Sequence, residues 1–173
     1  KDFGGPEVFE AEEVGQPNLR PNDLLVKLHA TSVNPVDLSI RQAGQWAGVK
    51  PPAIIGYDAS GVVEAVGEAV DSFVIGDEVY YTPEVLLGEP GTYAEYQAVN
   101  EAIVAHKPVN LSHQEAASIP LVGGTAFQAL ILRANLRVGE SVLIHGCGGV
   151  GSLAVQIAKA AGAFVIVSCS DYM

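Results

Sequence analysis

The residues best suited to chemistry are the glycines of a short loop in the last third of the chain. The run Gly146-Cys147-Gly148-Gly149-Val150-Gly151 has the spacing G-x-G-x-x-G, follows an apolar stretch at 141–145 and opens a segment with helical apolar spacing. A dinucleotide-binding loop requires this context, with a strand before it and a helix after it. The alternative is a glycine-rich turn that binds no ligand.

Each glycine of the motif has a separate task in such a loop. Gly146 permits the tight turn, Gly148 lets the backbone approach a pyrophosphate, and Gly151 lets the helix pack closely on the strand. The helix start adds free backbone N–H groups and a partial positive charge. The sequence therefore predicts a cofactor site made by the backbone of residues 146 and 148–151, namely Gly146, Gly148, Gly149, Val150 and Gly151.

The end of the next strand bears on the choice between NADPH and NADH. Sites that prefer NAD place an acidic residue there to hold the ribose hydroxyls. Here the strand runs into Cys169-Ser170-Asp171, and the spacing places Cys169 or Ser170 at the acidic position. A hydroxyl at Ser170 can donate to a 2′-phosphate, which favours NADPH. A shift of one residue would make Asp171 the ribose ligand, so NADH remains the alternative.

The elements that must position this loop fall into two groups. Residues 1 to about 110 are rich in short β-like runs separated by Gly and Pro, which predicts a compact, barrel-like β unit. The predicted strands cover 24–30, 59–67, 78–81 and 92–99.

The pattern changes near residue 112. Ser112 and Glu115 form a capping box that starts a helix, which Pro120 and Gly123-Gly124 are expected to interrupt before a second helix at 125–134. Apolar strands at 141–145 and 164–168 flank the helix that follows the glycine loop. Together they predict one βαβ unit of a parallel sheet.

Composition limits the partners. The net charge of −11, without a cluster of Lys or Arg, argues against a nucleic-acid partner. Two cysteines are too few for a disulfide framework or a cysteine-rich zinc site. No apolar run is long enough to span a membrane, and the first residues do not resemble a signal peptide. The expected location is the cytoplasm.

At this point the whole chain resembles a medium-chain dehydrogenase/reductase, and within that superfamily the zinc-independent NADPH:quinone oxidoreductases, which include zeta-crystallin. The glycine loop and four further runs carry the resemblance: Ser32-Val33-Asn34-Pro35-Val36-Asp37, Gly56-Tyr57-Asp58-Ala59-Ser60-Gly61-Val62-Val63, Gly91-Thr92-Tyr93-Ala94-Glu95-Tyr96, and Ala116-Ala117-Ser118-Ile119-Pro120 with Gly124-Thr125-Ala126. The spacing of the loop itself is closer to that of alcohol dehydrogenases, because many quinone reductases carry one more residue there.

The resemblance implies a fold of the α/β plus β class: a GroES-like β-barrel catalytic domain at residues 1–117, followed by the first part of a Rossmann domain at 118–173. A dinucleotide fold needs two βαβαβ halves, so the chain is expected to be part of a protein about twice as long, and inactive as an enzyme on its own. The family also implies a homodimer.

The rival branch of the family binds zinc. It places a Cys where Asn34 stands, a His where Tyr57 stands, and a Cys or Asp near Leu121. None of these ligands is present, so no metal is expected.

Without zinc, hydrogen bonds must polarise the substrate. The resemblance implies catalytic roles for Tyr57, whose hydroxyl can bond a carbonyl or quinone oxygen, and for Asn34 beside the nicotinamide. It also implies that Thr125, at the start of a helix, contacts the nicotinamide ribose. Asp37 is expected to cap a short helix. The predicted reaction is hydride transfer from NADPH to a quinone or an α,β-unsaturated carbonyl; an enoyl reductase and a non-catalytic NADPH-binding protein remain alternatives.

Overall fold

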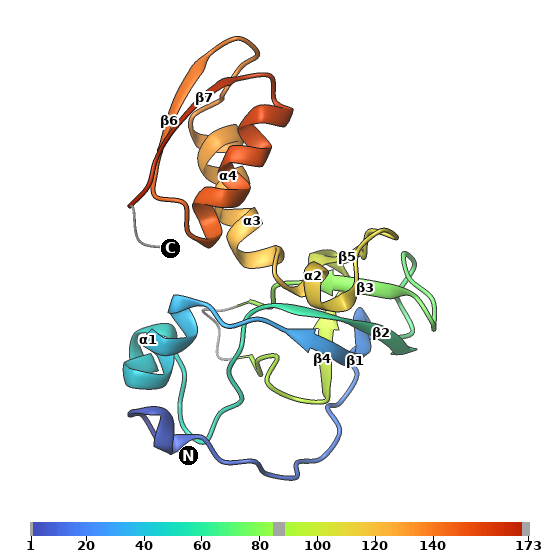
Figure 1. The fold of residues 1–173 in the computed structure, drawn as a ribbon. Helices are drawn as coiled ribbons and strands as arrows, with labels where there is room; N and C mark the ends of the chain where they lie inside the picture. Colours follow the sequence, from blue (N-terminus) through green and yellow to red (C-terminus); the bar gives the residue numbers. More distant parts are fainter. Residues whose placement is uncertain (1, 85–88, 171–173) are drawn as a thin grey trace. The chain divides into compact units, whose positions relative to one another are not determined.

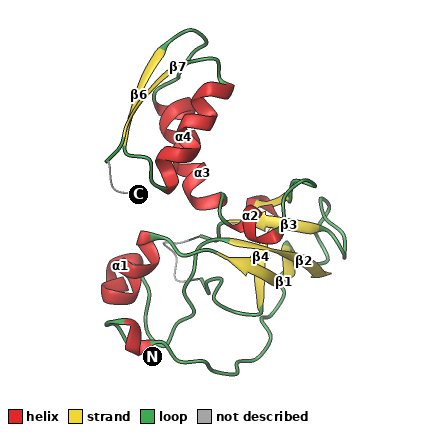
Figure 2. Cartoon of the chain, in the orientation of Figure 1, coloured by secondary structure: helices red, strands yellow, loops and turns green. Residues whose placement is uncertain are grey.

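The computed structural model describes residues 2–84 and 89–170. The chain divides into two compact units, residues 1–120 (the N-terminal unit) and residues 121–173 (the C-terminal unit). Figures 1 and 2 show that most strands belong to the first unit, whereas helices cover one face of a small sheet in the second. Each unit is described by itself.

The N-terminal unit is built on one antiparallel sheet. Five strands pair in the order β4-β1-β2-β3-β5 and form a curled half-barrel. Apolar side chains of these strands make its core, with Leu24, Val26, Val63 and Val79 fully buried. The strands are β1 (Asp23–Thr31), β2 (Ala59–Val66), β3 (Glu78–Tyr81), β4 (Tyr96–Asn100) and β5 (Val104–His106).

The predicted strands are confirmed except at the start of the fourth. Residues 92–95 form bends instead, because their backbone pairs with another loop. The N–H groups of Thr92 and Tyr93 donate to the carbonyls of Gly56 and Ile55, at 3.0 and 2.8 Å. This pairing draws the loop before β2 and the loop before β4 together, and the first of these loops carries Tyr57 and Asp58.

Two α-helices accompany this sheet. α1 (Pro35–Ala43) follows β1, and α2 (His113–Ala117) packs on β1 and β2. The predicted capping box of α2 is confirmed: the Ser112 hydroxyl accepts from the Glu115 N–H, and the Glu115 carboxylate accepts from the Ser112 N–H at 2.8 Å. Single 3₁₀ turns lie at Pro6–Val8, Gly44–Ala47 and Glu101–Ile103.

The C-terminal unit contains the predicted βαβ unit. β6 (Ser141–His145) and β7 (Phe164–Ser168) pair in parallel, with α4 (Gly149–Ala160) between them in sequence and packed on both. Alanines at 154 and 158 form the buried face of α4. The small side chains bring the helix close to the sheet.

The prediction that Gly123-Gly124 interrupt a helix is wrong. α3 runs from Pro120 to Phe127 through both glycines and continues as a π-helix at Gln128–Arg133. Proline is favoured at the first helical position, and the buried Ala126 and Leu130 anchor the segment. This packing outweighs a glycine cost of about 1 kcal/mol each. Thr125 therefore lies inside α3 and does not begin a helix.

Among the residues that the structure describes, none of the helices combines the length and apolar character needed to cross a membrane.

Candidate functional site

The glycine loop joins β6 to α4 and is open to solvent. Gly146 has φ +94°, and its N–H donates to the Ser168 carbonyl at the end of β7 over 2.7 Å. Gly148 is the N-cap of α4 and has extended backbone angles, φ −72° and ψ −164°. All residues from 145 to 150 are exposed. The loop thus turns sharply at the carboxyl end of the parallel sheet.

The three motif glycines are required for different reasons. Gly146 adopts a left-handed conformation that favours glycine. At Gly151 a methyl group would overlap the carbonyl oxygen of Gly146, so the helix can approach the loop only without a side chain. Gly148 differs from both, because its φ suits any residue and a Cβ there would meet, among the described residues beyond its two chain neighbours, no atom within 4 Å. The fold accounts for two of the glycines and leaves open space at the third.

The N-terminus of α4 faces the same loop. The Ser152 N–H donates to the Gly148 carbonyl at 2.9 Å and closes the first turn. The N–H groups of Gly149, Val150 and Gly151 therefore have no partner within the helix, and no side chain caps them. With the helix dipole, they make a site for an anionic oxygen.

Two further residues of the predicted cofactor site lie in the C-terminal unit. Ser170 is exposed, two residues beyond the end of β7, while its alternative, Asp171, lies outside the described residues. Thr125 is also exposed, and its hydroxyl donates to the Leu121 carbonyl one turn earlier in α3 at 2.8 Å.

In the N-terminal unit, Asn34 is held by a buried network. It is the N-cap of α1 and is 5% exposed. Its side-chain Nδ2 donates to Asp58 Oδ2 at 2.7 Å and to Ser32 Oγ at 3.1 Å. A carboxylate oxygen only accepts, which fixes the orientation of the amide. The side chain of Asn34 also forms a capping box with Asp37 at the start of α1, so the whole amide is fixed by protein partners.

Sequence reasoning gave Asp58 no role, although it is the centre of this network. It is fully buried, and its Oδ2 also accepts from the Ser32 hydroxyl at 2.6 Å. Its backbone carbonyl accepts from the Thr31 hydroxyl at 2.7 Å, and Thr31 contacts the buried Thr92 hydroxyl at 2.9 Å. The only signal in the sequence was an acidic residue placed directly before an apolar strand.

Tyr57 and Asp37 complete the cluster. Tyr57 is 2% exposed; burial, then the nearby Asp37 carboxylate, raises the pKa of its phenol. Burial also raises the pKa of Asp37. The hydrogen bond that Asp37 accepts from the Asn34 N–H at 2.6 Å lowers this pKa but does not cancel the effect of burial. The same hydrogen bond confirms Asp37 as a cap of α1. Tyr93 lies beside Asp37, and burial followed by that charge raises the pKa of Tyr93. The cluster therefore favours neutral phenols, which can donate hydrogen bonds.

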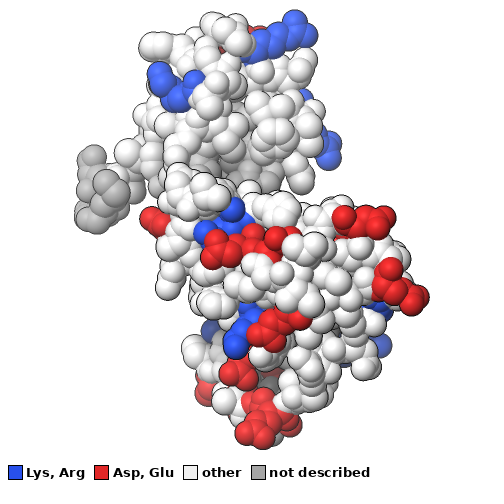
Figure 3. Space-filling model, turned by 90° about the vertical axis from the view of Figure 1, so that its right-hand side faces the viewer, with Lys and Arg blue, Asp and Glu red and all other residues white. Residues whose placement is uncertain are grey.

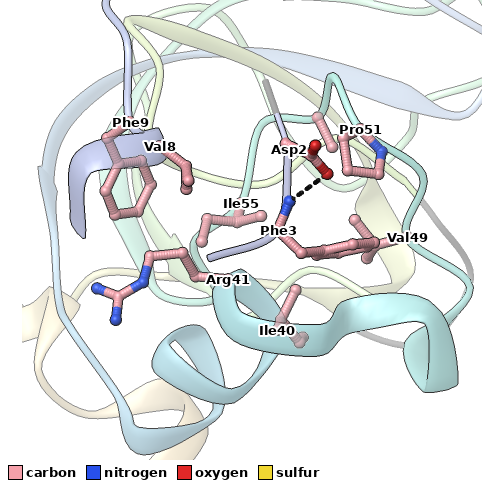
Figure 4. Close-up of a pocket in the computed structure, with 10 residues that line it drawn as sticks. Asp2, Phe3, Val8, Phe9, Ile40, Arg41, Val49, Pro51 and Ile55 are labelled. Atoms are coloured by element: carbon pink, nitrogen blue, oxygen red, sulfur yellow. Dashed lines mark hydrogen bonds between the residues drawn. The ribbon is translucent and has the colours of Figure 1, made fainter. Parts of the chain in front are cut away.

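A small pocket lies elsewhere in the same unit, where the N-terminal segment packs on α1 (Figure 4). The Gly4 N–H donates to the Arg41 carbonyl at 2.9 Å, and Arg41 Nε donates to the Gly4 carbonyl at 3.2 Å. The Arg41 guanidinium lies 6.0 Å from the centre of the Phe9 ring. The pocket measures about 40 Å³, and none of the predicted site residues lines it.

The two units differ in charge. Residues 1–120 contain 18 acidic and 6 basic residues, a net −12, whereas residues 121–173 contain 2 acidic and 3 basic residues, a net +1. Figure 3 shows the acidic side chains gathered on the N-terminal unit. An anionic ligand is therefore repelled less by the C-terminal unit, which carries the glycine loop, than by the acidic N-terminal unit.

Metal ligands are not gathered anywhere in the described ranges, 2–84 and 89–170: no group of three or more His, Cys, Asp or Glu side chains is placed to hold an ion.

Comparison with known proteins places this geometry in context. Residues 20–109 match the model of the alcohol dehydrogenase GroES-like domain. A zinc-type alcohol dehydrogenase-like protein of Staphylococcus aureus is 43% identical, over 94% of this chain and 49% of its own length. The NADPH-dependent alkenal/one oxidoreductase of Arabidopsis thaliana chloroplasts is 41% identical, over 91% of this chain and 42% of its own.

Solved structures agree with these matches. The quinone oxidoreductase of Coxiella burnetii superposes with a TM-score of 0.86 at 37% identity, over 98% of this chain and 55% of the other. The chain thus spans about half the length of the relatives that it matches. These findings confirm the fold expected from the sequence, a GroES-like β domain followed by the start of a Rossmann domain.

Proposed function

Because this chain belongs to the medium-chain dehydrogenase/reductase superfamily, we propose that the intact protein is an oxidoreductase that transfers hydride from NADPH to a quinone or an α,β-unsaturated carbonyl without zinc. Relatives named for quinone and for alkenal/one reduction support this acceptor class.

The observation that carries the proposal is the open space at Gly148. The described part of the fold does not require glycine there, since the backbone angles suit any residue and, apart from its two chain neighbours, no described residue has an atom within 4 Å of a Cβ. A bound pyrophosphate would require it, because a side chain would fill the space that the phosphates occupy. The free N–H groups at the start of α4 supply the hydrogen bonds for these phosphates.

The preference for NADPH rests on Ser170 and on charge. Ser170 is exposed just beyond β7 and offers a hydroxyl to a 2′-phosphate. The net +1 of the C-terminal unit tolerates the extra negative charge of that phosphate. Calorimetry with NADPH and NADH side by side tests the preference, and tighter binding of NADH would reverse it.

The bound dinucleotide supplies the hydride, and the side chains of the N-terminal unit supply orientation and polarity. Tyr57 is kept in its neutral form by burial, so its hydroxyl can donate to a substrate oxygen. The Asn34 amide is fixed by Asp58, Ser32 and the capping box of α1, and Asn34 is proposed to lie beside the nicotinamide. Tyr57 suits the substrate carbonyl. Thr125 is proposed to contact the nicotinamide ribose.

Zinc-dependent alcohol oxidation is the second candidate, favoured by the name of the Staphylococcus relative. Two features support the zinc-free reaction instead. Asn34 and Tyr57 stand where the zinc branch has Cys and His, and Asn34 already donates to Asp58. Elemental analysis of the purified intact protein decides between the two: the proposal expects zinc far below one equivalent, and a full equivalent that survives dialysis would exclude it.

The activity is tested with the intact protein and a panel of quinones and enones. The proposal expects NADPH oxidation, followed at 340 nm, that depends on the acceptor. Tight NADPH binding without turnover on any acceptor would instead identify a non-catalytic dinucleotide-binding protein. Failure to bind either dinucleotide would contradict the proposal as a whole. The intact protein is proposed to be a cytoplasmic homodimer, which light scattering and cell fractionation can test.

A further inference from the structure

Two cysteines lie at the glycine loop, and neither has a part in the proposed function. Cys147 lies inside the loop, between Gly146 and Gly148, and Cys169 directly follows β7. Both are free thiols and both are exposed. They are the two cysteines of the 173-residue chain.

The parallel pairing of β6 and β7 brings these thiols together. His145 is in register with Ser168, and the Gly146 N–H donates to the Ser168 carbonyl at 2.7 Å. Cys147 and Cys169 are the next residues after that hydrogen bond, and the Cys169 thiol is near enough to raise the pKa of Cys147. Continuing the register places Cys169 opposite Gly146, so Cys147 is its diagonal neighbour. With strands about 4.8 Å apart and about 3.3 Å between residues along a strand, diagonal Cα atoms lie about 5.8 Å apart, within the range of about 4.4–6.8 Å that a disulfide spans.

We propose that Cys147 and Cys169 are a reversible modification site, which a low-molecular-weight disulfide such as oxidised glutathione converts to an intramolecular disulfide that weakens dinucleotide binding. The inference rests on the proposed function for its effect on binding, but the formation of the disulfide does not.

The exchange balances without any other reactant. One cysteine thiolate attacks a sulfur of oxidised glutathione, forms a mixed disulfide and expels glutathione thiolate. The second cysteine, after losing its proton, attacks the protein sulfur and expels the other glutathione. The two protein thiols are oxidised to one disulfide, and one glutathione disulfide is reduced to two thiols. Desolvation and the neighbouring Cys169 raise the pKa of Cys147, so excess oxidant is needed near neutral pH.

The position of the bond explains why it would affect binding. It ties the loop peptide between Gly146 and Gly148 to the residue beside Ser170, so the backbone can no longer adjust to a pyrophosphate. It also places two sulfur atoms between the phosphate and ribose positions of the proposed site. Coupling between two sites is reciprocal, so a bound dinucleotide should slow formation of the disulfide.

The test uses the intact, reduced protein incubated with oxidised glutathione. We expect mass spectrometry to show the loss of two hydrogens and peptide mapping to locate a Cys147–Cys169 link. Calorimetry should show NADPH affinity lowered about tenfold or more and restored by dithiothreitol. The matched variant Cys169→Ser should stop at the mixed disulfide, one glutathione heavier.

Two results would overturn the inference. A wild-type protein that accumulates the mixed disulfide without the link would show that the thiols cannot pair. A linked protein with unchanged NADPH affinity would show that the bond does not control binding. If the reduced protein fails to bind NADPH or NADH, the proposed function itself is wrong, and the mass measurement still decides whether the two cysteines pair.

Discussion

The two units of this chain build their functional groups in opposite ways. In the N-terminal unit the candidate groups are side chains, and they are buried: Asn34, Tyr57 and Asp58 are 5%, 2% and 0% exposed. In the C-terminal unit the candidate phosphate-binding groups are backbone amides, and residues 145–150 of the loop that carries them are exposed. The first unit is strongly acidic, whereas the second is close to neutral.

This difference follows from what each kind of group needs. A side chain with several rotatable bonds must be held by neighbours, and the Asp58 carboxylate with its two hydrogen bonds holds Asn34. A backbone amide is already held by its helix, so it needs only the absence of side chains in front of it. Substitutions should therefore act through stability and turnover in the first unit, and through ligand binding in the second.

The largest effect is expected at Gly148. Replacement by Val should leave the fold intact, because the residues that the structure describes, apart from the two chain neighbours, place no atom within 4 Å of a Cβ there. The branched side chain would occupy the phosphate position, so dinucleotide affinity should fall by about 100-fold or more. Calorimetry with the intact protein measures the loss, and circular dichroism checks the fold.

Gly15 offers a matched control, since its Cβ would also meet no atom within 4 Å. Gly15→Val should leave dinucleotide affinity unchanged. Equal losses in the two variants, or no loss in folded Gly148→Val, would mean that the open loop is only a turn.

A different outcome is expected at Gly151, where the fold itself requires glycine. The methyl group of Gly151→Ala would overlap the Gly146 carbonyl oxygen, and such overpacking costs about 1–3 kcal/mol. Hydrogen exchange should therefore show faster opening of β6 and β7, with the strands of the N-terminal unit unaffected. If Gly151→Ala lost dinucleotide binding without destabilising β6 and β7, Gly151 and Gly148 would not differ in the way proposed.

The sequence predicted the C-terminal unit better than the site in the N-terminal unit. Both parallel strands and the turn between β6 and α4 were predicted correctly, because their signals are local: spacing, turns and apolar runs within about thirty residues. The cofactor-binding role of the glycine loop stays a prediction. The helix through Gly123-Gly124 was mispredicted because the packing of Ala126 and Leu130 overrides local propensity.

The network around Asn34 has no local signal. Asn34 and Asp58 are 24 residues apart, and Thr31 and Thr92 are 61 apart, so only the folded sheet and its loops bring them together. Motif resemblance pointed to Asn34 and Tyr57 one at a time. It did not predict that Asp58 would accept from the amino group of Asn34.

Asp58 is the place to test that network. Asp58→Ala would remove the acceptor shared by Asn34 and Ser32. Each buried donor left without a partner costs about 1–3 kcal/mol of stability. The hydrogen bond from Asn34 Nδ2 to Ser32 Oγ at 3.1 Å remains and offsets part of this cost. We expect the N-terminal unit to lose about 2 kcal/mol and turnover to fall, while dinucleotide affinity changes little.

Asp58→Asn is the matched control, because one amide oxygen can accept both hydrogen bonds that Asp58 Oδ2 now accepts. Thermal unfolding and turnover should lie between those of the wild type and Asp58→Ala. If Asp58→Ala lowers dinucleotide affinity as strongly as Gly148→Val, the separation between a side-chain site and a backbone site fails.

The smallest effect is a pH dependence confined to the N-terminal unit. His113 Nδ1 lies 2.8 Å from Ser60 Oγ, its Nε2 lies 3.3 Å from a Glu78 carboxylate oxygen, and its ring stacks on His29 at 4.6 Å. Burial, then repulsion from His29, lowers the pKa of His113, although Glu78 opposes the shift and Lys107 adds to it.

The sign of the effect follows from this lowered pKa. The unfolded chain binds a proton at a pKa of about 6.5, before the folded chain does, so acidification favours unfolding. The stability contributed by neutral His113 is present above about pH 6.5 and is lost as the pH falls toward the folded pKa. Hydrogen exchange of β2 and β3 amides, measured from pH 7.5 to 5.5 and corrected for intrinsic rates, should show this loss. The amides of β6 and β7 should show a smaller loss of stability. The variant His113→Gln should show no such loss in β2 and β3, since its amide side chain does not titrate. Equal slopes in wild type and His113→Gln would assign the pH dependence to another group.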